Sequence, residues 1–168
     1  MLLAAGCGTS TEGSAEPSGI SVAAPQIPDK FDPCTDIPQE ILDTEGLHST
    51  NSSTSTDEMR RGDIAWSGCR WVVSDGYATS ISATNLTIEM VRKRGVPGSR
   101  EVVVDGRKAI LTQSTGPEAC GLNAELVGGS LEFAVDNPSS NRLTGDQDPC
   151  DIAMRLAEKV LPLVPEDA

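Results

Sequence analysis

The chain has 168 residues and a formal net charge of −12 at pH 7, and its length fits one domain of ordinary size. The acidic charge argues against nucleic-acid binding, which needs a concentrated positive surface, and aromatic residues make up only 3% of the chain, too few for a stacking platform. A single histidine, His48, limits both metal binding and general-base catalysis.

The first residues are typical of the end of a bacterial lipoprotein signal peptide. Leu3-Ala4-Ala5-Gly6-Cys7 resembles a lipobox, in which small residues fit the signal peptidase and the cysteine thiol accepts diacylglycerol. Residues 1–6 lack the basic and long apolar regions of a complete signal peptide, so we interpret them as its remnant and expect the true start codon further upstream. The alternative is a cysteine that falls there by chance. We expect Cys7 to carry a lipid anchor on the extracytoplasmic face of the cell membrane.

Residues 7–30 are predicted to form a disordered tether. Residues 8–26 are rich in Gly, Ser, Thr, Pro and Ala and contain no aromatic residue, so they cannot bury enough apolar surface to offset chain entropy. A flexible tether lets an anchored domain stand away from the membrane. No run of 18 apolar residues occurs that would predict a membrane-spanning helix. Residues 31–168 are predicted to form a single domain.

The five cysteines are Cys7, Cys34, Cys69, Cys120 and Cys150. Without Cys7 an even set of four remains, which in an exported protein indicates two disulfides. Their wide spacing contains no C-x-x-C pair, so we predict neither a metal site nor a cofactor. Three pairings of the four cysteines are open.

The first predicted element is an N-terminal helix. Asp32-Pro33-Cys34 is typical of a helix start, with aspartate as the cap and proline at the first helical position. Residues 36–40 repeat the same signal, and Gly46 is expected to end the helix. A polar loop is predicted over residues 48–57.

Three hairpins are predicted after this loop. Their turns are Ser74-Asp75-Gly76, Asp105-Gly106 and Gly128-Gly129. The strands of the last hairpin alternate between apolar and polar residues, which predicts an antiparallel sheet with one solvated face. Residues 85–94 fit either a strand or a helix, and the basic run before Gly95 favours a short helix.

The last predicted element is a helix that begins at Asp148-Pro149-Cys150, again with a cap followed by proline. At the angular spacing of an α-helix, its apolar residues fall on one arc together with Cys150. We expect Cys34 to pair with Cys69 and Cys120 with Cys150, because each bridge would join a helix start to a neighbouring strand and close a short loop. A crossed pairing of Cys34 with Cys150 would instead join the two helix starts.

Four segments together resemble a family of actinobacterial cell-envelope lipoproteins of unknown function: Asp32-Pro33-Cys34, Cys69-Arg70-Trp71, Cys120 and Asp148-Pro149-Cys150. The resemblance covers about residues 32–162 and implies a helix, an antiparallel sheet and a closing helix, tethered outside the cytoplasmic membrane. The plan is also similar to the disulfide-bonded extracellular sensor domains of mycobacterial Ser/Thr kinases. The family implies no catalytic residues. We therefore predict an α+β domain with an N-terminal helix, an antiparallel β-sheet of five or six strands, a C-terminal helix packed on the sheet, and two disulfides.

A basic stretch departs from the acidic character of the chain. Residues 92–108 contain six cations and two acids and carry a net charge of +4, which leaves −16 for the rest. The cations are Arg92, Lys93, Arg94, Arg100, Arg107 and Lys108. We predict contact with anionic lipid headgroups or wall polymers, since basic residues near such a surface are attracted to it. The alternative is a set of helix-end and turn charges that only keep the sheet soluble.

Catalytic patterns are weak in this sequence. His48 lies in a Ser/Thr-rich loop, where an exposed side chain is the usual interpretation. The segment 136–151 does not follow the EF-hand pattern, because Pro149 and Cys150 come directly after Asp148, which is itself explained as a helix cap. We therefore expect no enzyme but a non-catalytic ligand-binding or sensor module of the cell envelope, with the groove between sheet and C-terminal helix as its site if that groove is open. The expected partners are the membrane, through the lipid anchor, and an unidentified envelope ligand or protein, but no nucleic acid. The alternatives are an accessory subunit of an envelope complex without a small-molecule ligand and, third, an envelope hydrolase.

Overall fold

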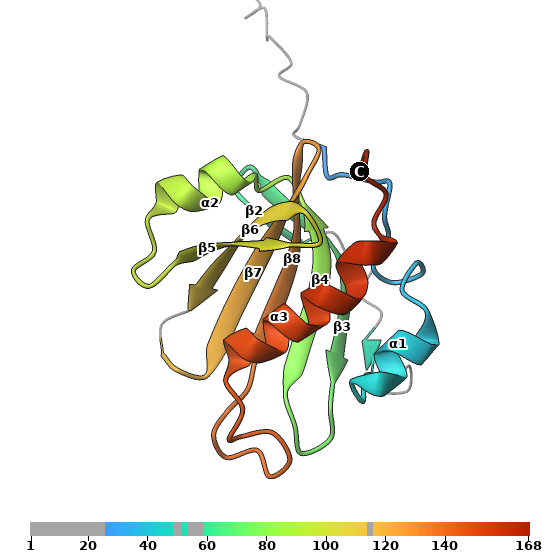
Figure 1. Cartoon of the computed structure of the whole chain (residues 1–168), viewed down its shortest axis with the longest axis vertical. Coiled ribbons are helices and arrows are strands. Elements are labelled where there is room, and N and C mark those ends of the chain that lie inside the picture. The colour runs from blue at the N-terminus through green and yellow to red at the C-terminus, as the bar shows by residue number, and fades with distance from the viewer. Residues whose placement is uncertain (1–25, 49–51, 54–58, 114–115) are drawn as a thin grey trace, which may run out of the picture.

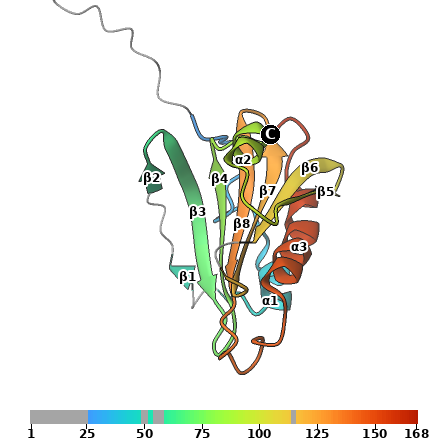
Figure 2. The same ribbon diagram turned by 90° about the vertical axis from the view of Figure 1, so that its left-hand side faces the viewer.

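The computed structural model of the chain describes residues 26–48, 52–53, 59–113 and 116–168 (Figure 1). Cys7 and residues 7–25 of the predicted tether lie outside these ranges. The described residues form one antiparallel sheet with the C-terminal helix α3, Pro149–Val160, along one face (Figure 2). None of the helices in the described ranges is long and apolar enough to cross a bilayer.

Eight strands make up the sheet, in the spatial order β1-β3-β4-β8-β7-β6-β5 with β2 also paired to β3. They are β1 Ser52–Ser53, β2 Met59–Arg61, β3 Ile64–Val72, β4 Ala78–Thr84, β5 Arg100–Val104, β6 Arg107–Gln113, β7 Ala119–Leu126 and β8 Gly129–Asp136. The predicted count of five or six strands is wrong. The three predicted hairpins are present as β3–β4, β5–β6 and β7–β8, and the additional strands β1 and β2 are too short to show an alternating pattern.

The register of the sheet places the core on one face. Cys69 lies opposite Ile81, Ile81 opposite Phe133, Phe133 opposite Leu122, and Leu122 opposite Leu111. All five side chains are buried. Helix α3 packs over this row, because its apolar arc points toward the sheet as the sequence pattern predicts.

The predicted N-terminal helix does not begin at Asp32. The Asp32 carboxylate accepts a hydrogen bond from the Cys34 amide at 2.9 Å, as a cap would, but residues 33–37 form turns. The helix in this region is the six-residue α1, Gln39–Thr44. Pro38 explains the difference, because a proline lacks the amide hydrogen and disfavours helical geometry in the residue before it.

Helix α2, Ile88–Arg94, confirms the helical prediction for residues 85–94. The Thr87 side chain accepts a hydrogen bond from the Met90 amide, and Gly95 ends the helix in a left-handed conformation, with φ of 58°. Ile88 and Val91 pack against Ile110 in a second, smaller apolar cluster. Since Ile110 alternates with the core residues of β6, α2 covers part of the face opposite α3.

Two disulfides join the expected cysteines: Cys34 is bonded to Cys69, and Cys120 to Cys150. The first bridge ties the segment before α1 to β3, and the second ties the first turn of α3 to β7. The segment before α1 and helix α3, which both lie on the core face, are thus covalently attached to the sheet.

Candidate functional site

The groove between α3 and the sheet is filled, contrary to its expected role as a binding site. Ile152, Ala153, Leu156 and Ala157 are buried on the inner face of α3, where they belong to the same apolar cluster as the core row of the sheet. Their side chains occupy the space that a ligand would need, so this interface holds the fold together.

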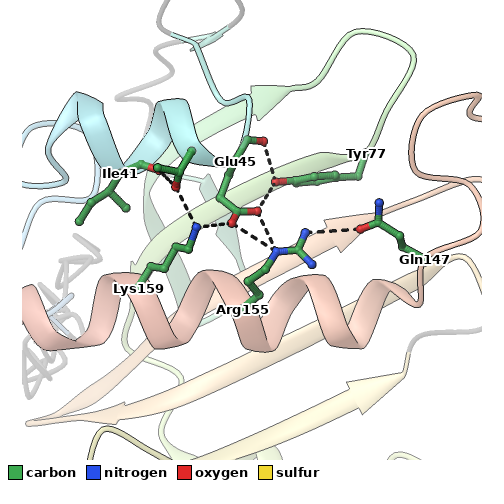
Figure 3. A network of polar contacts seen from close by, with 7 residues as sticks. Ile41, Glu45, Tyr77, Gln147, Arg155 and Lys159 are labelled. Carbon is green, nitrogen blue, oxygen red and sulfur yellow. Dashed lines mark hydrogen bonds and ion pairs between the residues drawn. The ribbon is translucent and has the colours of Figure 1, made fainter.

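A buried carboxylate lies beside this interface (Figure 3). The side chain of Glu45 is 5% exposed and accepts hydrogen bonds from Arg155 Nε at 3.0 Å and from Lys159 Nζ at 2.6 Å. Tyr77 Oη donates to the same carboxylate at 3.3 Å and to the Glu45 carbonyl oxygen at 3.2 Å. The network joins the residue after α1, the β3–β4 hairpin and α3.

The electrostatics of this network are those of a structural clamp. Burial by itself would raise the pKa of Glu45, but hydrogen bonds from Lys159 and Arg155 and their positive charges together lower it. The pKa of Tyr77 is raised by burial and by the negative charge of Glu45, so its phenol stays protonated at physiological pH. Glu45 therefore remains a carboxylate held by two cations, and Tyr77 is a hydrogen-bond donor rather than a nucleophile. No local pattern could reveal this network, because its members are up to 114 residues apart.

His48 lies at the surface, where its Nδ1 is 2.9 Å from Asp43 Oδ1. Hydrogen bonds from Gln39 and then from His48 lower the pKa of Asp43. Among the described residues, no hydroxyl or thiol group is hydrogen-bonded to the His48 ring, which a nucleophile–base pair would require.

An open pocket of about 780 Å³ lies where the β5–β6 turn, the β7–β8 turn, the start of α2 and the C-terminal residues meet. Four carboxylates line it, those of Glu89, Asp105, Glu125 and Glu166, against a single guanidinium, that of Arg107. In the described parts of the chain no group of three His, Cys, Asp or Glu residues has an arrangement that could hold a metal ion. The pocket therefore presents excess negative charge without a cation site.

Arg107 has a structural role in this pocket. Its guanidinium donates hydrogen bonds to the carbonyl oxygens of Glu125 at 3.2 Å, Val164 at 3.1 Å and Pro165 at 2.5 Å. These bonds hold the C-terminal segment against the end of the sheet. The contact of Arg107 with an anionic surface stays a prediction, and the hydrogen bonds of Nη1 and Nη2 give this residue a role inside the domain.

The other cations of the basic stretch lie on two different faces. Arg100 is opposite Leu111 and belongs to the α3 face of the sheet, whereas Lys108 is opposite Val103 on the α2 face. Arg92 Nε lies 2.7 Å from Glu101 Oε1. The six residues that the sequence groups together therefore do not form one surface.

The rest of the α2 face of the sheet carries mainly polar and small residues. Trp66 Nε1 donates to Glu132 Oε2 at 2.8 Å, and Asn123 Nδ2 donates to the same oxygen at 3.2 Å. Around this network the half-buried face is made mainly of small residues: Gly68, Ser80, Ser82, Gly121 and Ala134.

Residues 2–163 match a protein family described as DUF3558, protein of unknown function. The chain belongs to the DUF3558 family. No curated protein and no solved structure matches.

The DUF3558 match confirms the prediction of a family of unknown function. The matched residues include all five cysteines and both D-P-C segments. The match ends before the last residues of the pocket wall, Val164, Glu166 and Ala168.

Proposed function

We propose that this DUF3558 chain is a lipoprotein anchored through Cys7 on the extracytoplasmic face of the cell membrane, and that its domain is a non-catalytic binding module. One observation carries the proposal: Cys34, Cys69, Cys120 and Cys150 are all consumed by two disulfides. Structural disulfides are typical of exported proteins. Cys7 is thus the one cysteine that these bridges leave over, and it follows the small residues that a lipobox requires.

The pocket at the turn end supports the binding role. Its volume of about 780 Å³ lies within the range of small-molecule sites, and its wall is built from segments far apart in the sequence. Four carboxylates against one guanidinium favour a ligand that carries positive charge, such as an amine. The Glu125→Gln, Glu166→Gln variant should bind a polyamine probe such as spermine more weakly than the wild type, measured by calorimetry. Equal binding by both proteins would remove the pocket from the proposal.

The anchor is tested by expressing the gene with its upstream sequence in an actinobacterial host and fractionating the cells. Wild type should be found in the membrane fraction with a mass that includes diacylglycerol. Cys7→Ser should lack that added mass, whereas the neighbouring tether variant Thr9→Ala should keep it. A Cys7→Ser protein that still carries the added lipid mass would contradict the proposal, because the lipid could not then be attached to the Cys7 thiol.

A second candidate function is an accessory subunit of an envelope protein complex, and the surface of small residues around Ser82 is where we place its contact. Ser82, Glu132 and Asn123 form one row across β4, β8 and β7. A Ser82→Arg substitution would place a long charged side chain on this surface. A complex that is isolated with the wild type and with an Arg142→Gln control, but lost with Ser82→Arg, would support this role; no loss would oppose it.

A further inference from the structure

The last turn of α2 carries three consecutive cations, and a fourth, Lys108, lies on β6, the strand against which α2 packs. We call Arg92, Lys93, Arg94 and Lys108 the α2 basic patch. All four are exposed. Arg92 is paired with Glu101, whereas Lys93, Arg94 and Lys108 form no ion pair with any described residue. With Glu89, Glu101 and Glu125 counted, the three carboxylates whose charges act on Arg92, the patch has four positive charges against three negative ones, in a chain of net charge −12.

Two apolar side chains accompany these charges. Met90 is 38% exposed and precedes Lys93 and Arg94 by three and four residues, so it lies on the same side of the helix. Val103 is 69% exposed and lies opposite Lys108 in the β5–β6 register. Basic side chains beside exposed apolar ones are characteristic of surfaces that rest on anionic membranes, where headgroups meet the charges and the interface accepts the apolar groups.

The position of α2 in the molecule also favours contact with a membrane. The first described segment, drawn in blue, begins at the end of the domain where α2 lies, as both views show (Figures 1 and 2). An anchor at Cys7 would be 19 residues from Gln26. A tether with the flexibility predicted from the sequence would then have an end-to-end distance of about 25 Å. The anchor would therefore hold this end of the domain close to the headgroups, where a weak contact suffices because the local concentration of surface is high.

We propose that the α2 basic patch docks on an anionic phospholipid surface and orients the tethered domain on the membrane. This inference rests on the proposed function in one respect: it assumes that the N-terminal segment leads to an anchor in the membrane. Binding of a protein without the anchor cysteine tests the patch separately.

The experiment uses the full chain with Cys7→Ser and vesicles of phosphatidylcholine with or without phosphatidylglycerol, at low and high salt. The protein should bind the phosphatidylglycerol vesicles at low salt and dissociate as salt rises. Substitution of Lys93, Arg94 and Lys108 by Gln should lower the partition coefficient about a hundredfold, since each near-surface cation contributes roughly fivefold. A matched control substitutes Arg61, Arg70 and Arg100 by Gln; it removes three charges outside the patch and should lower binding only a few fold. Thermal unfolding of both variants should match that of the parent protein.

Three outcomes would overturn the proposal. Equal losses in the patch and control variants would show that only net charge matters. Equal binding to vesicles with and without phosphatidylglycerol would show that the patch does not recognise anionic lipid. Binding to inorganic polyphosphate without binding to vesicles would assign the patch to a soluble polyanion. None of these results bears on acylation of Cys7, because the experiment is done without that thiol.

Discussion

The two faces of the sheet differ in how they are covered. On one face, α3 packs over the row from Cys69 to Leu111, both bridges attach the flanking elements, and the Glu45 clamp closes the side. On the other face, α2 covers only the cluster around Ile110, and the rest presents small polar residues and the Trp66–Glu132 hydrogen bond. Among the described residues, the contacts that stabilise the domain are therefore concentrated on the α3 face.

The bridges of the α3 face should have the largest effect when removed. Each closes a loop of about 30 to 36 residues, which corresponds to roughly 4 kcal/mol in the chain-entropy description of disulfides. Replacing all four bridging cysteines by Ala should therefore remove most of a total stability of about 5–15 kcal/mol. Chemical denaturation of the single-bridge variants Cys34→Ala, Cys69→Ala and Cys120→Ala, Cys150→Ala measures the two contributions. If both variants unfold at the same denaturant concentration as the wild type, the disulfides do not contribute to the stability of the domain.

Neighbouring residues of β8 give the sharpest contrast between the faces. Phe133 is buried on the α3 face, and Ala134 points to the opposite face. Phe133→Ala should lower the free energy of unfolding by about 3–5 kcal/mol, because it leaves a cavity in the core. Ala134→Ser should change it by less than about 0.5 kcal/mol. Similar losses at the two positions would mean that the second face is also covered in the native protein, for example by a partner subunit.

The clamp should have an intermediate effect. Glu45→Gln replaces a carboxylate that accepts hydrogen bonds from two cations, and a loss of about 2 kcal/mol is expected from the usual value for such charged hydrogen bonds. Arg142→Gln, an exposed pair with Asp75, is the matched surface control and should leave the unfolding midpoint unchanged. If Glu45→Gln shifts the unfolding midpoint no more than the control does, the Glu45 network contributes no more to stability than an exposed ion pair.

The clamp also predicts a change of stability with pH. The pKa of Glu45 is lowered in the folded state from an ordinary value of 4.5. Its contribution is therefore present above that unfolded-state value and is lost as the pH falls through the lower folded-state value. The free energies of unfolding of wild type and Glu45→Gln should differ most near neutral pH, and the difference should shrink as the pH falls below 4.5. A difference that is constant with pH would show that the carboxylate charge does not matter.

The smallest effect is expected on the α2 face. Arg92→Gln breaks the exposed pair with Glu101, and such pairs contribute little because solvent screens them. The unfolding midpoint should not change measurably, even though this residue belongs to the surface proposed to contact lipid. A clear loss of stability would instead make Arg92 a structural residue of the α2–β5 junction.

Turns and alternation predict most of the fold. Asp105-Gly106 after the run Val102-Val103-Val104 predicts the β5–β6 hairpin. Asp148-Pro149-Cys150 predicts the start of α3, and Cys150 is bonded to Cys120 of β7. These signals are local, so they can be read without the structure. The N-terminal helix was mispredicted because the cap at Asp32 is real but Pro38 interrupts the segment that follows it.

The candidate sites depend on contacts between distant residues, which the sequence does not encode locally. Arg107 was grouped with its basic neighbours, yet its partners are carbonyl oxygens up to 58 residues away. The division of Arg100 and Lys108 between the two faces follows from strand register, which could have been derived from the alternation of β5 and β6. The pairing of Glu45 with Arg155 and Lys159 carries no such signal.

The mass of the mature protein, purified intact from the membranes of the organism that makes it, tests the central claim most directly. Our account predicts that it begins at Cys7, that it carries diacylglycerol on that residue, and that it is four hydrogens lighter than the reduced chain because of its two disulfides. A protein whose Cys7 carries no lipid, or which retains the residues before Cys7, would contradict the account.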